Sequence, residues 1–306
     1  MTSDTSTSEL DRVNRGEWAR DRVVGQFGAA GAGDRLDTWS DPGEQAAVTA
    51  IASLVRGRPI LDVGVGGGRT TRLLRLLSDD YVAVDYTQEM VDACRANFPD
   101  ADVRLSDARD LSQFETGRFA LVVFSYNGLD AIGHFDRLTA LAEMARVLAP
   151  GGVLLYSTHN LDGPCHRATP LRLAGSPVAH TWTRAYRIGF AILRLLQAPV
   201  VLPRAIRNYR RLQALAIGHG SWAIGPNEAH DFGLLVHYVS RAGIEEEVER
   251  AGLSVHAVLD AEHGHEVSAG ADASAVRYFH VLARTRGDGV KDTGNVSTPE
   301  MKFDSR

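Results

Sequence analysis

The sequence predicts an α/β protein with a doubly wound, mostly parallel sheet of seven strands and an inserted helical cap. Three observations support this fold class. Apolar runs of strand length alternate with helix-length segments between residues 60 and 157. The runs are continuously apolar, as expected for strands that helices cover on both faces. The alternation then stops for about 75 residues before it resumes, which is too long an interruption for a plain loop.

The expected elements follow in order. Helices are predicted over 17–27 and 43–56, and the second is marked by Pro42 ahead of it and Glu44 in its first turn. The apolar runs predict strands at 60–64, 81–85, 102–105, 119–124, 152–157, 253–259 and 277–284. Periodic apolar positions between the strands predict helices at 69–77, 87–97, 134–148 and 240–251.

The interruption divides the chain into a sheet domain and a cap. Residues 16–159 and 236–286 form the predicted cofactor-binding domain, and 160–235 form the cap over the carboxyl edge of the strands, where open α/β sheets bind ligands. Two helix-like segments, 183–197 and 204–216, are separated by prolines in this cap. The polar ends, 1–15 and 287–306, are expected to be disordered and flexible.

Composition limits the classes of function. The chain has 306 residues, a formal charge of −5, 44% apolar and 23% charged residues, which gives no general case for nucleic-acid binding. Two cysteines allow no disulfide framework. The start has no signal-peptide core, and no uncharged apolar run is long enough to span a membrane. The expected location is cytoplasmic, and the oligomeric state is left open.

The most informative segment is a glycine-rich turn between two predicted strands. An apolar run ends at Gly64, Gly66 and Gly68, a helix follows, and the next strand ends on Asp85. In a β-α-β unit such a turn lets a ligand lie against bare backbone, and the acid accepts hydrogen bonds from ribose hydroxyls. Arg69 stands where a dinucleotide turn needs its third glycine, which argues against NAD or FAD and against a nicotinamide oxidoreductase.

The ordered motifs resemble those of class I S-adenosylmethionine (SAM)-dependent methyltransferases, strongly over residues 39–160 and weakly over 236–285. The matching segments are residues 62–68, 84–86, 107–111, 119–124 and 146–152, and 39–44 and 157–160 resemble a bacterial subgroup. The resemblance implies a Rossmann-like methyltransferase fold whose last two strands form an antiparallel hairpin. It also implies SAM as cofactor and S-adenosylhomocysteine as product.

The predicted cofactor site follows the parts of SAM, which carries no phosphate. Asp85 suits the ribose diol, Tyr86 the adenine face, and Asp107 the adenine amino group. The full predicted set is Asp62, Gly64, Gly66, Gly68, Arg69, Asp85, Tyr86, Asp107, Ala108, Ser125 and Asn127. Asp62, the glycine backbone and Arg69 are assigned to the methionine end. Structural alternatives stay open: Asp62 ties down the turn, Asp107 caps a helix, or Arg69 is solvated.

The acceptor is expected at the ends of the fourth and fifth strands. His159 is the first choice for a general base, because a strand-end histidine lies at the cleft and titrates in the useful range. Asp130 and His134 are weaker catalytic candidates, and residues 219–238 suit a pocket rim. A structural histidine is the alternative for His159. We predict no metal site, including at the pair His263 and His265, which lacks further ligands.

The cap is rich in arginine, with nine between Asn160 and Leu215 against one acid, Asp162. Three interpretations stay open: a solvated face, an anionic acceptor bound by guanidinium groups, or a membrane-surface helix. The predicted function is methyl transfer from SAM to a small polar acceptor, a sugar or natural-product scaffold, at oxygen rather than nitrogen. The alternatives are a SAM-binding protein that does not methylate and a methyltransferase of a membrane-associated or lipid-linked acceptor.

Overall fold

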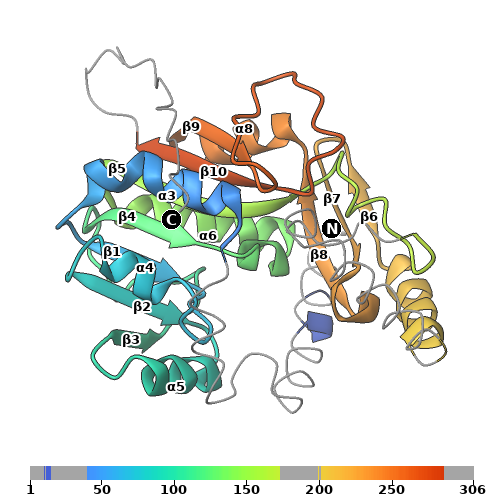
Figure 1. Ribbon diagram of the computed structural model, residues 1–306, viewed down its shortest axis with the longest axis horizontal. Helices are drawn as coiled ribbons and strands as arrows, with labels where there is room; N and C mark the ends of the chain where they lie inside the picture. Colours follow the sequence, from blue (N-terminus) through green and yellow to red (C-terminus); the bar gives the residue numbers. More distant parts are fainter. Residues whose placement is uncertain (1–9, 11, 15–39, 173–198, 200, 286–306) are drawn as a thin grey trace, which may run out of the picture.

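The computed structural model describes residues 10, 12–14, 40–172, 199 and 201–285. It has the predicted α/β class, with helices packed on a twisted, mostly parallel sheet (Figure 1). The strands are β1 (Ile60–Val63), β2 (Tyr81–Asp85), β3 (Asp102–Leu105), β4 (Phe119–Phe124), β5 (Leu148–Asn160), β6 (Ile217–His219), β7 (Trp222–Asn227), β8 (Leu234–Val239), β9 (Leu253–Asp260) and β10 (Tyr278–Thr285). The helices are α3 (Pro42–Val55), α4 (Thr71–Arg75), α5 (Gln88–Asn97), α6 (His134–Val147) and α8 (Arg241–Arg250), with short 3₁₀ turns η1 (Gly128–Ala131) and η3 (Ala229–Phe232).

Seven strands make the predicted core sheet. Strands β3, β2, β1, β4 and β5 are parallel neighbours in that order. Strand β10 lies antiparallel between β5 and β9, as the family resemblance implies. The carboxyl ends of the parallel strands therefore meet along one edge, and the candidate residues that follow them gather there.

Helices cover the core sheet on both faces. On one face α3, α4 and α5 bury Ile51, Leu74 and Cys94 against the strands. On the other face α6 and α8 bury Leu141 and Val248. This two-sided burial explains why the strands read as unbroken apolar runs.

The cap differs from the prediction of a purely helical insertion. Its described part has a helix over 201–213 and three strands, which bring the sheet to ten strands. Strand β5 extends beyond the end of β4. Strand β8 pairs in parallel with this extension of β5, at His159 and Asn160. The predicted helices 17–27 and 183–197 lie outside the described residues. The cap thus joins the core sheet at the strand end that carries His159.

The N-terminal segment also differs from its expected disorder in the part that the structure describes. Leu10 is buried among Leu212, Ile224 and Leu235. The side chain of Asn14 is buried and bonds the backbone of Leu235 and Ala131. These residues bind the cap to the core. Among the described residues no helix combines the length and hydropathy needed to cross a bilayer.

Candidate active site

The turn after β1 is built by glycines for two different physical reasons. Gly64 has φ +66°, and a Cβ there would lie 2.4 Å from the ring of Phe124. Gly66 has φ +56°, but a Cβ there meets no atom within 4 Å. Gly68 packs against a phenyl ring. Gly64 therefore permits close packing, whereas Gly66 leaves its backbone open toward the edge where a ligand binds.

Asp85 holds this turn from the end of β2. One carboxylate oxygen accepts the N–H of Gly66 at 3.0 Å, and the other accepts the N–H of Thr87 at 3.0 Å. Burial raises the pKa of Asp85, and these N–H donors oppose the rise. Asp85, the residue predicted to bind the ribose, is thus held in one position beside the glycine turn.

Asp62 lies beneath the turn and is fully engaged in packing it. It accepts hydrogen bonds from Thr70 Oγ1 at 2.6 Å and from the hydroxyl of Tyr81 at 2.7 Å. Burial raises its pKa to about 6. This geometry matches the structural alternative, in which Asp62 ties the turn to α4 and β2; its role toward the methionine end stays a prediction.

Arg69 is partnered within the protein. Its guanidinium bonds both carboxylate oxygens of Glu44 at 2.6 and 2.7 Å and Ser125 Oγ at 2.6 Å, and it lies over the ring of Tyr126. Ser125 also donates to Glu44. Glu44 is a buried residue that sequence reasoning noted only as the start of a helix. The resemblance of segment 39–44 to a bacterial subgroup was the only sequence signal that could have indicated a role for Glu44 at the site.

The loop after β4 has an unusual backbone. Tyr126 and Asn127 are consecutive non-glycine residues with φ +56° each, a conformation that costs free energy and concentrates at functional sites. The N–H of Asn127 donates to Ser157 Oγ at 2.7 Å, whereas its buried Oδ1 has no hydrogen-bond partner among the described residues. The strained loop follows β4 at the edge of the sheet where the site is predicted, and it holds an amide oxygen that has no partner among the described residues.

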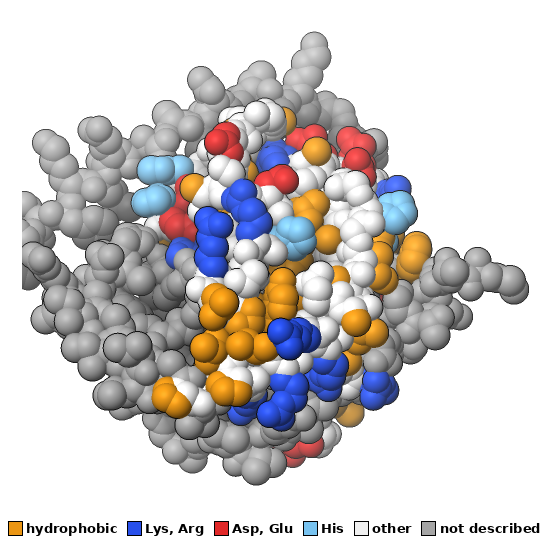
Figure 2. Space-filling view, turned by 90° about the vertical axis from the view of Figure 1, so that its right-hand side faces the viewer, with side chains coloured by type: hydrophobic (Ala, Val, Ile, Leu, Met, Phe, Trp, Pro, Cys, Tyr) orange, Lys and Arg blue, Asp and Glu red, His pale blue; other side chains and the backbone are white. Residues whose placement is uncertain are grey.

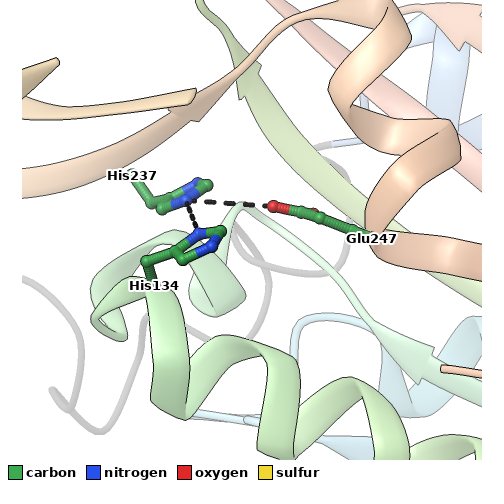
Figure 3. Close-up of side chains that lie close together, drawn as sticks. All are labelled: His134, His237 and Glu247. Atoms are coloured by element: carbon green, nitrogen blue, oxygen red, sulfur yellow. Dashed lines mark hydrogen bonds and ion pairs between the residues drawn. The ribbon is translucent and has the colours of Figure 1, made fainter. Parts of the chain in front are cut away.

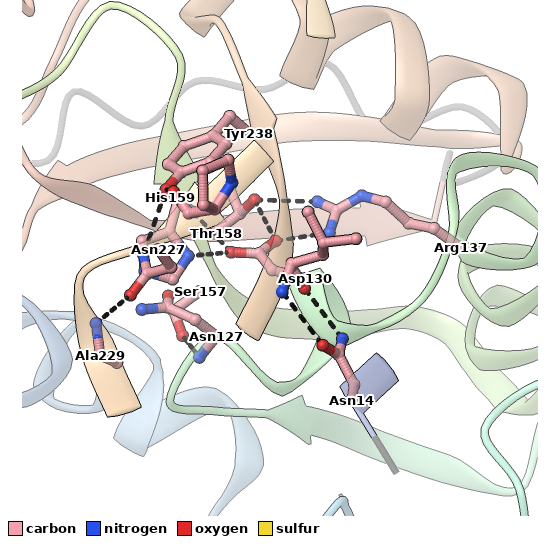
Figure 4. A network of polar contacts seen from close by, with 12 residues as sticks. Asn14, Asn127, Asp130, Arg137, Ser157, Thr158, His159, Asn227, Ala229 and Tyr238 are labelled. Atoms are coloured by element: carbon pink, nitrogen blue, oxygen red, sulfur yellow. Dashed lines mark hydrogen bonds and ion pairs between the residues drawn. The ribbon is translucent and has the colours of Figure 1, made fainter. Parts of the chain in front are cut away.

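The strongest polar feature is a pair between Asp130 and His159 (Figure 4). Asp130, which is completely buried in η1, lies 2.6 Å from Nδ1 of His159 and accepts the backbone N–H of His159 at 2.7 Å. The side chain of His159 at the end of β5 is 14% exposed. The structure therefore brings together two of the three predicted catalytic residues.

A buried arginine supports this pair. Arg137 of α6 donates to Asp130 at 2.7 Å and to Thr158 at 3.0 Å. Its Nε lies 3.0 and 3.1 Å from the two carboxylate oxygens of Glu247 in α8. One guanidinium thus serves two buried carboxylates. Sequence reasoning missed Arg137 and Glu247, because each sits in an ordinary helical pattern with no local signal.

The cap fixes the tautomer of His159. Asn227 Oδ1 accepts the N–H of Ala229 at 2.9 Å, so its Nδ2 must be the donor that lies 3.2 Å from His159 Nε2 and 3.2 Å from the Tyr238 hydroxyl. His159 Nε2 therefore carries the lone pair and Nδ1 carries the proton toward Asp130. This is the arrangement of a histidine base oriented by a carboxylate.

His134 occupies a different place from the Asp130–His159 pair. Its Nδ1 lies 3.0 Å from Nε2 of His237, and its ring stacks on Trp222 at 3.9 Å. Burial, with a smaller contribution from Arg137, lowers the pKa of His134 to about 4. Such a weak base does not suit proton abstraction near neutral pH.

Two further residues predicted to bind the cofactor near its adenine, Asp107 and Ala108, follow the end of β3. Asp107 accepts both a backbone N–H and two guanidinium bonds from Arg109, and a third of its side chain is exposed. Ala108 is buried in the core. Asp107 organises its own loop, and its contact with adenine stays a prediction.

Comparison with known proteins identifies the domain that carries the glycine turn. A family model described as "Methyltransferase domain" matches residues 60–152, which include the glycine turn and Asp85. This segment of the chain is a methyltransferase domain, and the chain is similar to SAM-dependent methyltransferases.

Curated relatives match over about a third of the chain. A probable SAM-dependent methyltransferase of Mycolicibacterium smegmatis is 31% identical over 111 residues, covering 36% of the chain and 41% of the relative. A ubiquinone biosynthesis O-methyltransferase of Xanthomonas oryzae pv. oryzae is 32% identical, covering 34% and 44%. A phthiotriol/phenolphthiotriol dimycocerosates methyltransferase of Mycobacterium ulcerans is 36% identical, covering 36% and 40%. The chain spans less than half the length of each of these relatives.

Solved methyltransferases share the fold over most of the chain. The 1,6-didemethyltoxoflavin-N1-methyltransferase of Burkholderia thailandensis has a TM-score of 0.52 at 14% identity, covering 91% of this chain and 90% of its own. The CcbJ methyltransferase of Streptomyces caelestis has a TM-score of 0.51 at 17% identity, covering 83% and 96%. At such identities the likeness concerns the fold alone.

The residues at this edge of the sheet fit SAM. Three large side chains are exposed at the carboxyl ends of β2, β3 and β4, namely Tyr86, Leu105 and Tyr126. Tyr86 follows Asp85 directly, and Leu105 pairs with Asp85 in the sheet. An exposed apolar group next to a buried carboxylate suits a nucleoside. The buried Oδ1 of Asn127, which has no partner among the described residues, offers a further hydrogen-bond acceptor.

Proposed function

We propose that this protein transfers the methyl group of SAM to a hydroxyl of a small polar acceptor, a sugar or natural-product scaffold, with His159 as general base. The observation that carries the proposal is the Asp130–His159 contact of 2.6 Å at the carboxyl end of β5. An amine acceptor needs only to lose its proton, whereas a hydroxyl needs a base close to the reacting oxygen. The oriented histidine therefore supports O-methylation.

The chain's residues have separate tasks in this proposal. Bound SAM supplies an electrophilic methyl group on a sulfonium. Asp85 accepts hydrogen bonds from the ribose hydroxyls, and the backbone at Gly66 lies against the ligand. Cap residues around Asn227 close the acceptor side, because methyl transfer needs an in-line approach and exclusion of water.

His159 is the group that would receive the proton. As the acceptor oxygen gained the methyl group and the sulfur–methyl bond broke, Nε2 of His159 would take the hydroxyl proton. The acceptor hydroxyl replaces the long contact of 3.2 Å between Asn227 and Nε2. Asp130 stabilises the resulting imidazolium through Nδ1. The products are a methyl ether, S-adenosylhomocysteine and a protonated His159.

Two variants test this proposal. Asp85→Ala should abolish detectable SAM binding by calorimetry, and unchanged affinity would refute the cofactor site. His159→Ala should keep SAM affinity but lower S-adenosylhomocysteine formation, measured with labelled SAM and a small-molecule extract, by about 100-fold or more. Exposed His263→Ala is the matched control. Near-normal turnover in His159→Ala would make that residue structural, and no turnover in the parent with any acceptor would favour a non-methylating SAM-binding protein.

A second candidate concerns the acceptor class. Arg204, Arg207, Arg210 and Arg211 are exposed on the helix 201–213, and Figure 2 shows arginine side chains around an apolar area on the cap face. A cavity of about 520 Å³ lies between this helix and the β6–β7 hairpin. These features favour an anionic or lipid-linked acceptor. Sedimentation with anionic vesicles tests the lipid version, and binding that does not respond to salt or to Arg207→Ala would remove it.

A further inference from the structure

A second polar cluster lies outside the proposed catalytic pair. It consists of His134, His237 and Glu247, whose side chains converge from three elements (Figure 3). His134 opens α6, His237 lies in β8 of the cap, and Glu247 lies in α8. All three are buried. The two histidines are 103 residues apart in sequence, so no spacing motif announces the cluster.

The ligand-type atoms stand close enough to share one ion. His134 Nδ1 lies 3.0 Å from His237 Nε2, which lies 3.8 Å from Oε1 of Glu247. All three atoms are within 4.8 Å of one another. Ligands at about 2.0–2.2 Å from a tetrahedral zinc are separated by roughly 3.3 Å. The distances of 3.0 and 3.8 Å in the cluster lie on either side of this value, so small side-chain movements suffice for all three atoms to bind one ion.

The cluster contains a carboxylate from a buried ion-pair network. Arg137 is shared by Asp130 and Glu247, so this buried group of three carries a formal charge of −1. A cation held by Glu247 and the two histidines offsets that charge.

The surroundings keep the ligands in position. Trp222 stacks on His134 at 3.9 Å with an interplanar angle of 6°, and it lies 5.5 Å from His237. Nε of Arg137 donates to both oxygens of Glu247, at 3.1 Å to Oε1 and 3.0 Å to Oε2, which fixes the carboxylate with Oε1 toward the histidines. Such outer contacts orient metal ligands in proteins.

We propose that Nδ1 of His134, Nε2 of His237 and a carboxylate oxygen of Glu247 bind one divalent transition-metal ion, for which this donor set favours Zn²⁺. A water completes the tetrahedron. The ion joins the cap strand β8 to α6 and α8 of the core. It therefore acts as a structural clamp, and its binding raises the stability of the folded protein.

The test uses the full chain carrying His263→Asn and His265→Asn. This background removes a second cluster, in which Asp260 lies beside two exposed histidines. After treatment with EDTA, this parent should bind one Zn²⁺ by equilibrium dialysis, show visible Co²⁺ absorption of tetrahedral type, and melt at a higher temperature with Zn²⁺. Adding His134→Ala should weaken Zn²⁺ binding by about 100-fold or more. Adding Phe135→Ala, at the exposed neighbouring position, is the matched control.

Two results would overturn the proposal. One is a parent that neither binds Zn²⁺ at micromolar concentration nor shows the Co²⁺ spectrum. The other is a folded His134→Ala variant, checked by circular dichroism, that binds as tightly as its parent. Should that variant fail to fold, the parent's stoichiometry, Co²⁺ spectrum and Zn²⁺-dependent melting decide alone. None of these readouts involves methyl transfer, so the outcome is independent of the proposed function.

Discussion

The turn after β1 and the polar network at the end of β5 hold buried carboxylates in two different ways. At the turn, Asp85 accepts N–H groups from Gly66 and Thr87, which are 19 and 2 residues away. In the network, Asp130 meets His159 across 29 residues, and Arg137 reaches Glu247 across 110 residues. The turn is therefore a product of one local β-α-β unit. The network is complete only with Glu247 of α8 and Asn227 of the cap, which lie far from the pair in sequence.

The two regions also differ in the donors that satisfy their carboxylates. Asp85 is held by neutral N–H groups of a loop that stays open beside exposed apolar side chains. Asp130 accepts from a guanidinium, a hydroxyl and a histidine inside the core. Neutral donors leave the turn free to receive a ligand, whereas the charged network fixes one orientation of His159. Preorganised geometry of this kind suits a general base.

The largest effect is expected from breaking the network at its centre. Arg137→Ala leaves the buried carboxylates of Asp130 and Glu247 without their counter-charge, so we expect a loss of about 3–5 kcal/mol in the free energy of unfolding. Arg104→Ala is the control, because its pair with Asp102 is exposed and such pairs contribute about 1 kcal/mol or less. Urea unfolding measures both. A small effect of Arg137→Ala would show that the network does not hold the fold together.

The same contrast explains which parts of the fold could be predicted. The core strands and helices follow from continuous apolar runs and from the glycine turn, which are local signals. The cap strands were missed, although Gly220-Ser221, which joins His219 to Trp222, is a two-residue hairpin signal. Strand β8 also reads as an apolar run. Its position in the sheet depends on pairing with the end of β5, which sequence spacing does not reveal.

The candidate site was predictable to a similar extent. Asp130 and His159 were each named from their positions at strand ends, but their pairing depends on a tertiary contact. Glu44 and Asn227 reach Arg69 and His159 from 25 and 68 residues away. No pattern within one element predicts such partners. His134 was named as a possible base, and its stacking on Trp222 is a tertiary contact that the sequence does not reveal.

The pH dependence of stability tests the buried carboxylate Asp62 beneath the glycine turn. Asp62 has a pKa of about 6 in the folded protein against 3.8 for the unperturbed group, so the folded protein keeps a proton between these values that the unfolded chain loses. Stability from this group is present below about pH 4 and is lost as the pH rises through 6, by at most about 3 kcal/mol. Asp62→Asn keeps an acceptor for Thr70 and Tyr81 and should remove this dependence.

The measurement for Asp62 is the difference in unfolding free energy between the variant and the wild type at several pH values. The difference cancels the contributions of other carboxylates. A difference that stays constant from pH 4 to 7 would contradict the raised pKa. The same variant separates the two roles left open for Asp62. Loss of SAM affinity without loss of stability would assign it to the methionine end.

The smallest effect on stability is expected at the open glycine of the turn. Gly66→Ala forces alanine into a left-handed conformation in open space, at a cost of about 1 kcal/mol. Gly64→Ala adds a clash with Phe124 to the same backbone cost and should destabilise by clearly more. If SAM lies against the backbone of Gly66 as proposed, the new Cβ should lower SAM affinity by about 10-fold or more in that variant. Thermal melting and calorimetry separate the two effects. Equal stability losses, or unchanged SAM affinity in Gly66→Ala, would mean that the turn is shaped for packing alone and that the ligand lies elsewhere.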